Sequence, residues 1–308
     1  DVSKFTGRVE IVDAQMEDLI GLLRGDFNGI LHSDPFARCL VEGTDSGAET
    51  KLTTLLDVLQ SQNGGHPLTI DASVIFELGG TAKEELLWAL LSLLEYANRG
   101  VSWEAIWLHV SADSNIMQTV VKFRALRQMM HGLATQLHLE DGYPNVCAET
   151  SMRMFSRADE HNNMLRGLYA AVGAVWGGCD GLILHGFDTL TGSSEHAHRI
   201  AQNMHAVLKE ESGLDNWMDP LFGSYQIESQ TQALCTQVWS EFVSRSDVGL
   251  QGLLKDGFLE RLQHLRIAKQ DIIATQRASV TGVTAFADPA ERLGTDWLTS
   301  TSNHFFRD

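Results

Sequence analysis

The chain has 308 residues and a formal net charge of −17, with 44% hydrophobic and 20% charged residues. This is the composition of a globular protein with one large α/β domain or two small ones, and its acidic balance argues against nucleic acid or an anionic membrane as a partner. The four cysteines are far apart and form no Cys-x-x-Cys pair, which favours free thiols in a reducing compartment, the cytoplasm, over disulfides or a zinc site.

Apolar stretches alternate with amphipathic ones along the chain. Strands are predicted over residues 8–12, 27–32, 67–73, 105–111, 144–150 and 180–185, with a loop over 217–228 entering a seventh. Apolar residues at helical spacing predict helices over 14–23, 51–60, 116–133, 231–243 and 250–273. A capping box at Thr81-Ala82-Lys83-Glu84 begins a further helix, whereas residues 281–308 show no clear element.

This alternation predicts a parallel sheet covered by helices. About seven strand–helix units favour a (β/α)8 TIM barrel over an open sheet, and the sequence shows no glycine-rich phosphate loop after a strand, which disfavours a doubly wound fold. We expect the barrel to occupy residues 1–290, an irregular segment to occupy 291–308, and the missing first strand to lie upstream of Asp1.

In such a barrel, functional residues lie in the loops that follow the strands. The polar residues at these positions are Ser33-Asp34, Glu77, Asp113, Glu149-Thr150-Ser151, His185 with Asp188, and Asp219. Glu149 and His185 end neighbouring predicted strands, so together they can form a carboxylate–imidazole acid/base pair. The competing interpretation is that these residues cap helices and close loops, which is the commoner use of such side chains.

The other candidate ligands and nucleophiles have simpler explanations. Asp159-Glu160-His161 resembles the start of the Asp-x-His-x-x-Gly motif that ligates cobalt, but Met164 stands where glycine is needed and the segment opens a helix, so a surface or capping role is favoured for His161. His198 and His205 share a helix face near Glu195 and His196 but have no third metal ligand. Cys147 is expected to be a buried structural thiol.

Several motifs are shared with one enzyme family. They are Asn162-Asn163 with Arg166, Gly177-Gly178, Arg199-Ile200-Ala201-x-Asn203, Glu210-Glu211-Ser212-Gly213, Asp219-Pro220-x-x-Gly223-Ser224-Tyr225, Gly79-Gly80-Thr81-Ala82-x-Glu84-Glu85-Leu86 and Lys122-Phe123-Arg124-Ala125-x-Arg127. With them, residues 27–289 resemble the coenzyme-A-handling barrel of the adenosylcobalamin-dependent acyl-CoA mutases, the methylmalonyl-CoA mutase family.

The strand ends depart from the catalytic pattern of that family. Where catalytic members carry a histidine and a glutamine for the substrate thioester and the migrating group, this chain has Cys147 and Glu149, although Thr150-Ser151 is kept. The stretch 182–188 is similar to the Val-Leu-Pro-Phe-Asp pattern of the family's small subunit. Residues 33–37 and 280–286 also look like that subunit.

The resemblance implies a non-catalytic small (beta) subunit of a heterodimeric methylmalonyl-CoA mutase. Its large subunit would bind adenosylcobalamin and interconvert succinyl-CoA and methylmalonyl-CoA, a step of propionate metabolism, while this chain would hold no cofactor and no metal. Cys147, Glu149 and His185 would be degenerate equivalents of catalytic positions. Two alternatives stay open: a catalytic barrel that uses Glu149 and His185 with cobalamin from a partner, and a scaffold or chaperone-like barrel that binds a mutase transiently.

Overall fold

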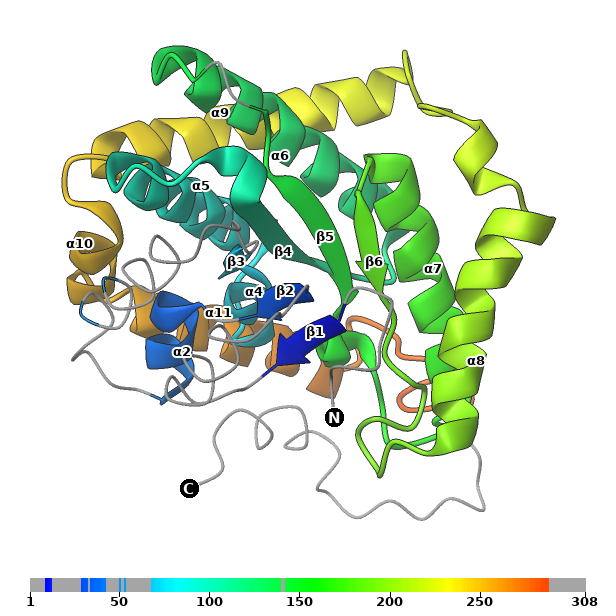
Figure 1. The fold of residues 1–308 in the computed structure, drawn as a ribbon. Coiled ribbons are helices and arrows are strands. Elements are labelled where there is room, and N and C mark those ends of the chain that lie inside the picture. The colour runs from blue at the N-terminus through cyan, green and yellow to red at the C-terminus, as the bar shows by residue number, and fades with distance from the viewer. Residues whose placement is uncertain are drawn as a thin grey trace.

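The computed structural model describes residues 9–12, 29–32, 34–42, 50, 53, 68–139 and 142–287. Six strands form one parallel sheet in the order β1-β2-β3-β4-β5-β6 (Figure 1). They are β1 Val9–Val12, β2 Gly29–His32, β3 Leu68–Asp71, β4 Ile106–Ala112, β5 Asn145–Thr150 and β6 Gly181–Ile183. Because sequence order equals sheet order, each crossover returns the chain beside the strand it left, as in a repeated β–α unit. The predicted α/β class with a parallel sheet is confirmed.

Helices cover this sheet (Figure 1). They are α2 Pro35–Glu42, α4 Ser73–Glu77, α5 Ala82–Asn98, α6 Ile116–Gln136, α7 Asn162–Gly177, α8 Glu195–Ala206, α9 Tyr225–Arg245, α10 Gly249–Lys255 and α11 Phe258–Ala274. Short turns of helix lie at η2 Trp103–Ala105, η3 Met152–Met154, η4 Val207–Glu211 and η5 Leu214–Asn216. The helices predicted over 14–23 and 51–60, the latter apart from Thr53, and the segment 291–308 lie outside the described residues.

The main core lies between β3–β5 and helices α5 and α6. Helix α5 begins at the predicted capping box: Thr81 is the N-cap, and its backbone N–H donates to Glu84 Oε2 at 2.9 Å. Trp88 and Tyr96 on this helix are fully buried, and Trp88 stacks on Phe258 of α11 with ring centroids 6.1 Å apart. Helix α9 packs over α5 and α6 (Figure 1). In the described part of the chain, no helix is long and apolar enough to cross a membrane.

The predicted seventh strand is wrong. The chain enters helix α9 at Tyr225, after Gly223 has turned it at a φ of +78°. The buried residues of α9 are Ile227, Thr231, Cys235, Val238 and Phe242. Their spacing of three and four residues places them on one face of a helix. This helical repeat decides the structure of the segment, although the segment begins with a short apolar run that suggested a strand.

Two further boundaries differ from the prediction. The helix predicted over 250–273 is divided into α10 and α11, because Gly257 adopts a left-handed φ of +75° between them. Strand β6 ends at Ile183, so His185 lies in the loop that follows the strand. Residues 281–287 are irregular as predicted, with one isolated bridge between Thr281 and Ala285.

The described sheet has β1 and β6 at its two edges. Its six strands are two fewer than a closed (β/α)8 barrel contains, so the sheet is barrel-like in order and direction, and its closure stays a prediction.

Candidate functional site

The register of β4, β5 and β6 brings together three titratable side chains, from the middle of β4, the end of β5 and the loop after β6. His109 on β4 is paired in register with Cys147, and Glu149 on β5 is paired with Ile183. Glu149 Oε1 lies 2.8 Å from His185 Nε2, and Glu149 Oε2 lies 3.7 Å from His109 Nδ1. The predicted meeting of Glu149 and His185 is confirmed. We call His109, Glu149, His185, Glu77 and Ser151 the strand-end cluster.

The cluster keeps Glu149 ionised. Burial alone would raise the pKa of its carboxyl, but the interactions with His109 and His185 outweigh burial and lower that pKa. Burial lowers the pKa of His185, whereas its bond to Glu149 raises it, and the net shift is upward. His109 is 1% exposed, and Glu149 and His185 are each 21% exposed, so this pair is only weakly screened by water.

Glu77, at the end of α4, completes the cluster. Its carboxylate accepts a hydrogen bond from Ser151 Oγ. Burial raises the pKa of Glu77 to about 7, because the hydrogen bond from Ser151 and the charge of Arg153 offset it only in part. The proximity of Glu149 also raises this pKa, and His185 lowers it. Glu77 therefore exchanges protons near neutral pH, the behaviour required of an acid/base group.

A buried ion pair lies next to this cluster. Lys122 Nζ is 2.6 Å from Glu85 Oε2 and 2.8 Å from Ser111 Oγ, so it joins α6 to α5 and β4. Ser111 donates to Glu85 through both its backbone N–H, at 2.6 Å, and its hydroxyl, at 2.9 Å. The side chain of Glu85 is fully buried and that of Lys122 is 4% exposed. Since every charge in the group has partners, its role is structural.

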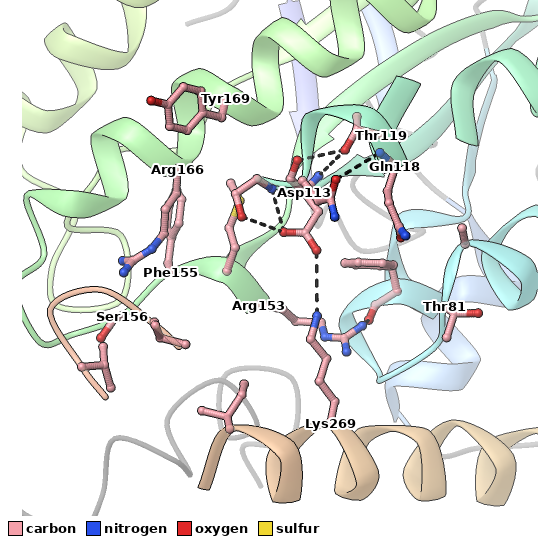
Figure 2. A pocket seen from close by; sticks show the side chains of 18 of the residues that line it. Thr81, Asp113, Gln118, Thr119, Arg153, Phe155, Ser156, Arg166, Tyr169 and Lys269 are labelled. Atoms are coloured by element: carbon pink, nitrogen blue, oxygen red, sulfur yellow. Dashed lines mark hydrogen bonds and ion pairs between the residues drawn. The ribbon is translucent and has the colours of Figure 1, made fainter. Parts of the chain in front are cut away.

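Figure 2 shows a cavity of about 780 Å³ that is lined by Arg153, the residue whose charge acts on Glu77 of the cluster. Its walls come from the loop that enters α5, the start of α6, η3, the first turns of α7, and α11. Figure 2 shows Lys269 extending from α11 toward Asp113, with Nζ and Oδ2 3.9 Å apart, and Arg153 beside it. Arg166 and Tyr169 line the cavity from α7.

Other predicted strand-end residues serve the local backbone. Asp34 accepts hydrogen bonds from the backbone N–H groups of Phe36 at 2.9 Å, Ala37 at 3.2 Å and Asp71 at 2.9 Å, so it caps α2 and ties it to β3. Burial raises the pKa of Asp34 to about 6. Asp188 accepts from Ser194 N at 3.0 Å before α8. For these residues the capping interpretation is confirmed, whereas Ser33 lies outside the described residues.

Asp219 and the helical histidines lie apart from the cluster. Asp219 binds Arg124 at 2.8 Å and fixes the loop that enters α9. His161 is exposed at the start of α7 and stacks on Phe187, with ring centroids 5.0 Å apart. His198 is exposed and lies 3.2 Å from Gln202, and His205 is half-buried. Within the described ranges, no three His, Cys, Asp or Glu side chains are placed to hold a metal ion.

All four cysteines are free thiols, in agreement with the prediction. Cys147 is 4% exposed on β5, and its Sγ lies against the Ala148 carbonyl at 4.0 Å. It is buried, as expected of a structural thiol.

Sequence reasoning missed His109, the Glu85–Lys122 pair and the cations of the cavity. His109 gave no signal of its own, because its closeness to Glu149 depends on the register that pairs His109 with Cys147 and Ser111 with Glu149. Lys122 had a weak signal, as a lysine among the apolar positions of α6. Arg153 and Lys269 had none, because they are 116 residues apart and only the fold brings them together.

The cluster can hold and exchange protons through Glu77. The carboxylate of Glu149 is kept ionised, so it can only accept hydrogen bonds. An ionised Glu149 cannot donate to a carbonyl oxygen as a glutamine amide does, and a thiol is a weak donor. His185, which could donate from its imidazole, is already bound to Glu149.

Comparison with known proteins identifies relatives of this chain. Residues 27–304 match the family model described as methylmalonyl-CoA mutase. The probable methylmalonyl-CoA mutase small subunit of Mycobacterium bovis is 30% identical over 245 residues, which are 75% of this chain and 40% of that protein.

Two other relatives carry the same description. The methylmalonyl-CoA mutase small subunit of Streptomyces virginiae is 29% identical over 298 residues, covering 90% of this chain and 47% of the relative. That of Propionibacterium freudenreichii subsp. shermanii is 28% identical over 271 residues, covering 82% and 42%. The chain thus spans less than half the length of these relatives.

Proposed function

This chain belongs to the methylmalonyl-CoA mutase family, and from that premise we propose that it is the barrel of a non-catalytic small subunit. In this proposal residues 1–290 form a barrel domain that is completed to (β/α)8. A large subunit binds adenosylcobalamin and interconverts succinyl-CoA and methylmalonyl-CoA in the cytoplasm. This chain stabilises that subunit in a heterodimer.

The strand-end cluster is the observation that carries the proposal. The resemblance places a histidine and a glutamine of catalytic members at the positions of Cys147 and Glu149. Both are donors suited to a thioester carbonyl, and both are replaced here. Glu149 is held by His185 at 2.8 Å and kept ionised, so it has no proton to donate. The position therefore serves the packing of β4, β5 and β6.

Among the described residues, the candidate cobalt ligand does not fit that role. His161, the candidate from the Asp-x-His-x-x-Gly comparison, stacks on Phe187 at the start of α7. Met164 lies in the first turn of that helix, where the motif needs a glycine in a loop. We therefore assign adenosylcobalamin to the large subunit.

An exposed apolar surface supports the role of a partner. Trp217, Met218, Phe222 and Tyr225 are 69%, 101%, 82% and 85% exposed within nine residues. We call these four residues, three of which are aromatic, the aromatic patch. Soluble monomers rarely expose so many large apolar side chains together, and such patches mark interfaces.

Glu210 and Glu211, which precede the patch in the chain, are also exposed. Two copies of this chain meeting through the patch would bring like charges together, which costs free energy in an already acidic protein. The patch therefore suits a different chain with an apolar pocket and a basic rim, and we assign it to the large subunit.

Co-purification tests the proposal. We expect the chain, co-expressed with the large subunit of the same mutase, to elute as a stable one-to-one complex in size-exclusion chromatography with light scattering. The double substitution Trp217→Asp and Phe222→Asp is expected to break the complex while leaving the thermal midpoint of the chain within about 2 °C. Val243→Asp is the matched control, because Val243 is also an exposed apolar residue, with 55% of it exposed. It lies on α9, about 27 Å along the helix from Tyr225 at 1.5 Å per residue.

Failure of the chain to bind the large subunit at all would refute the subunit proposal and favour a transient scaffold or chaperone-like role. If the complex forms and survives the double substitution, the subunit role stands and the aromatic patch is not its interface.

One observation favours the catalytic alternative. Glu149 and His185 are in contact, and Glu77 beside them has a pKa of about 7, so general acid/base chemistry on a coenzyme A thioester is geometrically possible. Turnover of methylmalonyl-CoA by this chain, lost in Glu149→Gln, would establish that alternative.

A further inference from the structure

The cavity of Figure 2 gathers positive charge in a chain with a net charge of −17. Its charged lining residues are Lys122, Arg153, Arg166, Lys269 and Asp113. Lys122 is neutralised by Glu85, which leaves three cations and one carboxylate among the described lining residues. An excess of cations in a partly enclosed space is an electrostatic site for an anion.

Arg166 has neutral partners. Its Nη1 donates to Asn163 Oδ1 and its Nη2 donates to the Thr281 carbonyl, each at 2.6 Å. Within residues 68–139 and 142–287, it contacts no carboxylate. Burial lowers the pKa of Arg166, since the charge of nearby Asp159 compensates only in part. The two bonds orient the guanidinium plane, and no anion among the described residues contacts it.

Arg153 and Lys269 provide the charge on the other side. Arg153 Nη1 donates to the carbonyls of Phe76 and Gly80, the latter at 2.9 Å, and the guanidinium lies 4.6 Å from the centroid of the Phe76 ring. In the described part of the chain it too makes no contact with a carboxylate. Lys269 is half exposed, and its distance of 3.9 Å from Asp113 is at the limit of an ion pair. Its four-carbon stem lets the ammonium move toward a ligand.

The remaining wall is apolar and open to solvent. Leu165 and Tyr169 lie one turn apart on α7 and are 54% and 50% exposed. Ile273 of α11 and Val283 line the cavity with them. Cations beside an apolar wall, in a volume typical of small-molecule sites, define a ligand with an anionic head and an apolar body.

We propose that this cavity binds an organic anion, a carboxylate or phosphate monoester that carries an aliphatic chain. Arg166 of α7, Lys269 of α11 and Arg153 of η3 supply the positive charge that attracts the head group. The aliphatic chain lies along Leu165 and Tyr169. The site is independent of the strand-end chemistry and of the subunit role, because it requires neither the large subunit nor Glu149.

Calorimetric titration of the full chain tests this proposal. The probes are octyl phosphate and octanoate, each below its critical micelle concentration, with inorganic phosphate and octanol as the head and the tail alone. We expect at least one of the two amphiphilic anions to bind about tenfold more tightly than phosphate, and octanol to give no measurable binding. The anion that binds more tightly identifies the head group.

Charge-removing variants locate the ligand. Arg166→Gln is expected to weaken binding about tenfold or more, since it removes one of the three positive charges that attract the head group. Lys269→Gln is expected to weaken it about threefold, because that side chain is half exposed. Lys255→Gln removes the same charge from an exposed position at the end of α10 and is expected to change affinity less than twofold.

Arg166 also holds Thr281, so circular dichroism melting must show that the variant is folded. Arg166→Lys keeps the charge and is expected to bind within about threefold of the wild type. The proposal is overturned if neither amphiphilic anion binds, if phosphate alone binds as tightly as both, or if Arg166→Gln and Lys269→Gln behave like Lys255→Gln.

Discussion

The substitution Glu149→Gln tests how much the strand-end cluster contributes to the unfolding free energy of the chain. The substitution keeps the size of the side chain but removes the charge that faces His185 at 2.8 Å. A hydrogen bond to a charged group contributes about 1.5–3 kcal/mol, and the contact with His109 at 3.7 Å is too long to add a second one. Allowing for the 21% exposure of both partners, we expect the variant to lose about 2 kcal/mol of unfolding free energy at pH 5.5.

The loss should depend on pH with a defined sign. The folded pKa of Glu149 is lowered, so its contribution is present above its ordinary value of 4.5 and is lost as pH falls. The folded pKa of His185 is raised, so its contribution is present below its ordinary value of 6.5 and is lost as pH rises past the folded pKa. The difference between wild type and variant is therefore largest between these two values and falls below about 1 kcal/mol well above the folded pKa of His185.

Urea unfolding at pH 5.5 and 8.5, with an NMR titration of His185, measures both effects. Equal stability at pH 5.5, or an unchanged pKa of His185 in the variant, would refute this account of the cluster.

Two further substitutions test the scaffold beside the cluster. Lys122→Met leaves Glu85 buried without its cation and is expected to lower the unfolding free energy, measured in urea, by about 3–5 kcal/mol. The double variant Glu85→Leu with Lys122→Met should regain most of that loss. A double variant no more stable than Lys122→Met would contradict the assignment of the pair. Thr81→Ala removes the N-cap of α5 and is expected to cost about 1 kcal/mol, while Thr135→Ala, at the exposed end of α6, serves as the control and should cost less than about half of that. Equal losses in these two variants would show that the capping box contributes little.

The strands of the sheet were predictable because each is a short apolar run beside a turn. Periodicity correctly predicted β3, β4 and β5 and the start of α5, where the residues themselves carry the capping box. It failed at Tyr225, because the first residues after Gly223 carry too little of the helical repeat to reveal α9. The break at Gly257 was missed for a different reason: a single glycine inside a helical pattern is compatible with a continuous helix.

The pair of Glu149 and His185 could be predicted, since neighbouring parallel strands end at one edge. The third member, His109, depends on register, which the sequence does not specify. The cavity could not be predicted at all. Its cations, Arg153, Arg166 and Lys269, come from three separate elements. Lys269 of α11 lies near Asp113 only in the folded chain, because the two residues are far apart in the sequence.

We propose that this chain does not catalyse the isomerisation for which its family is named. The most direct test of this claim is the rate at which the purified chain, supplied with adenosylcobalamin, converts methylmalonyl-CoA to succinyl-CoA in the absence of the large subunit. We expect no conversion above the rate without protein, and the same result for Glu149→Gln. Conversion by the chain alone, abolished in Glu149→Gln, would contradict the claim and make the strand-end cluster an active site.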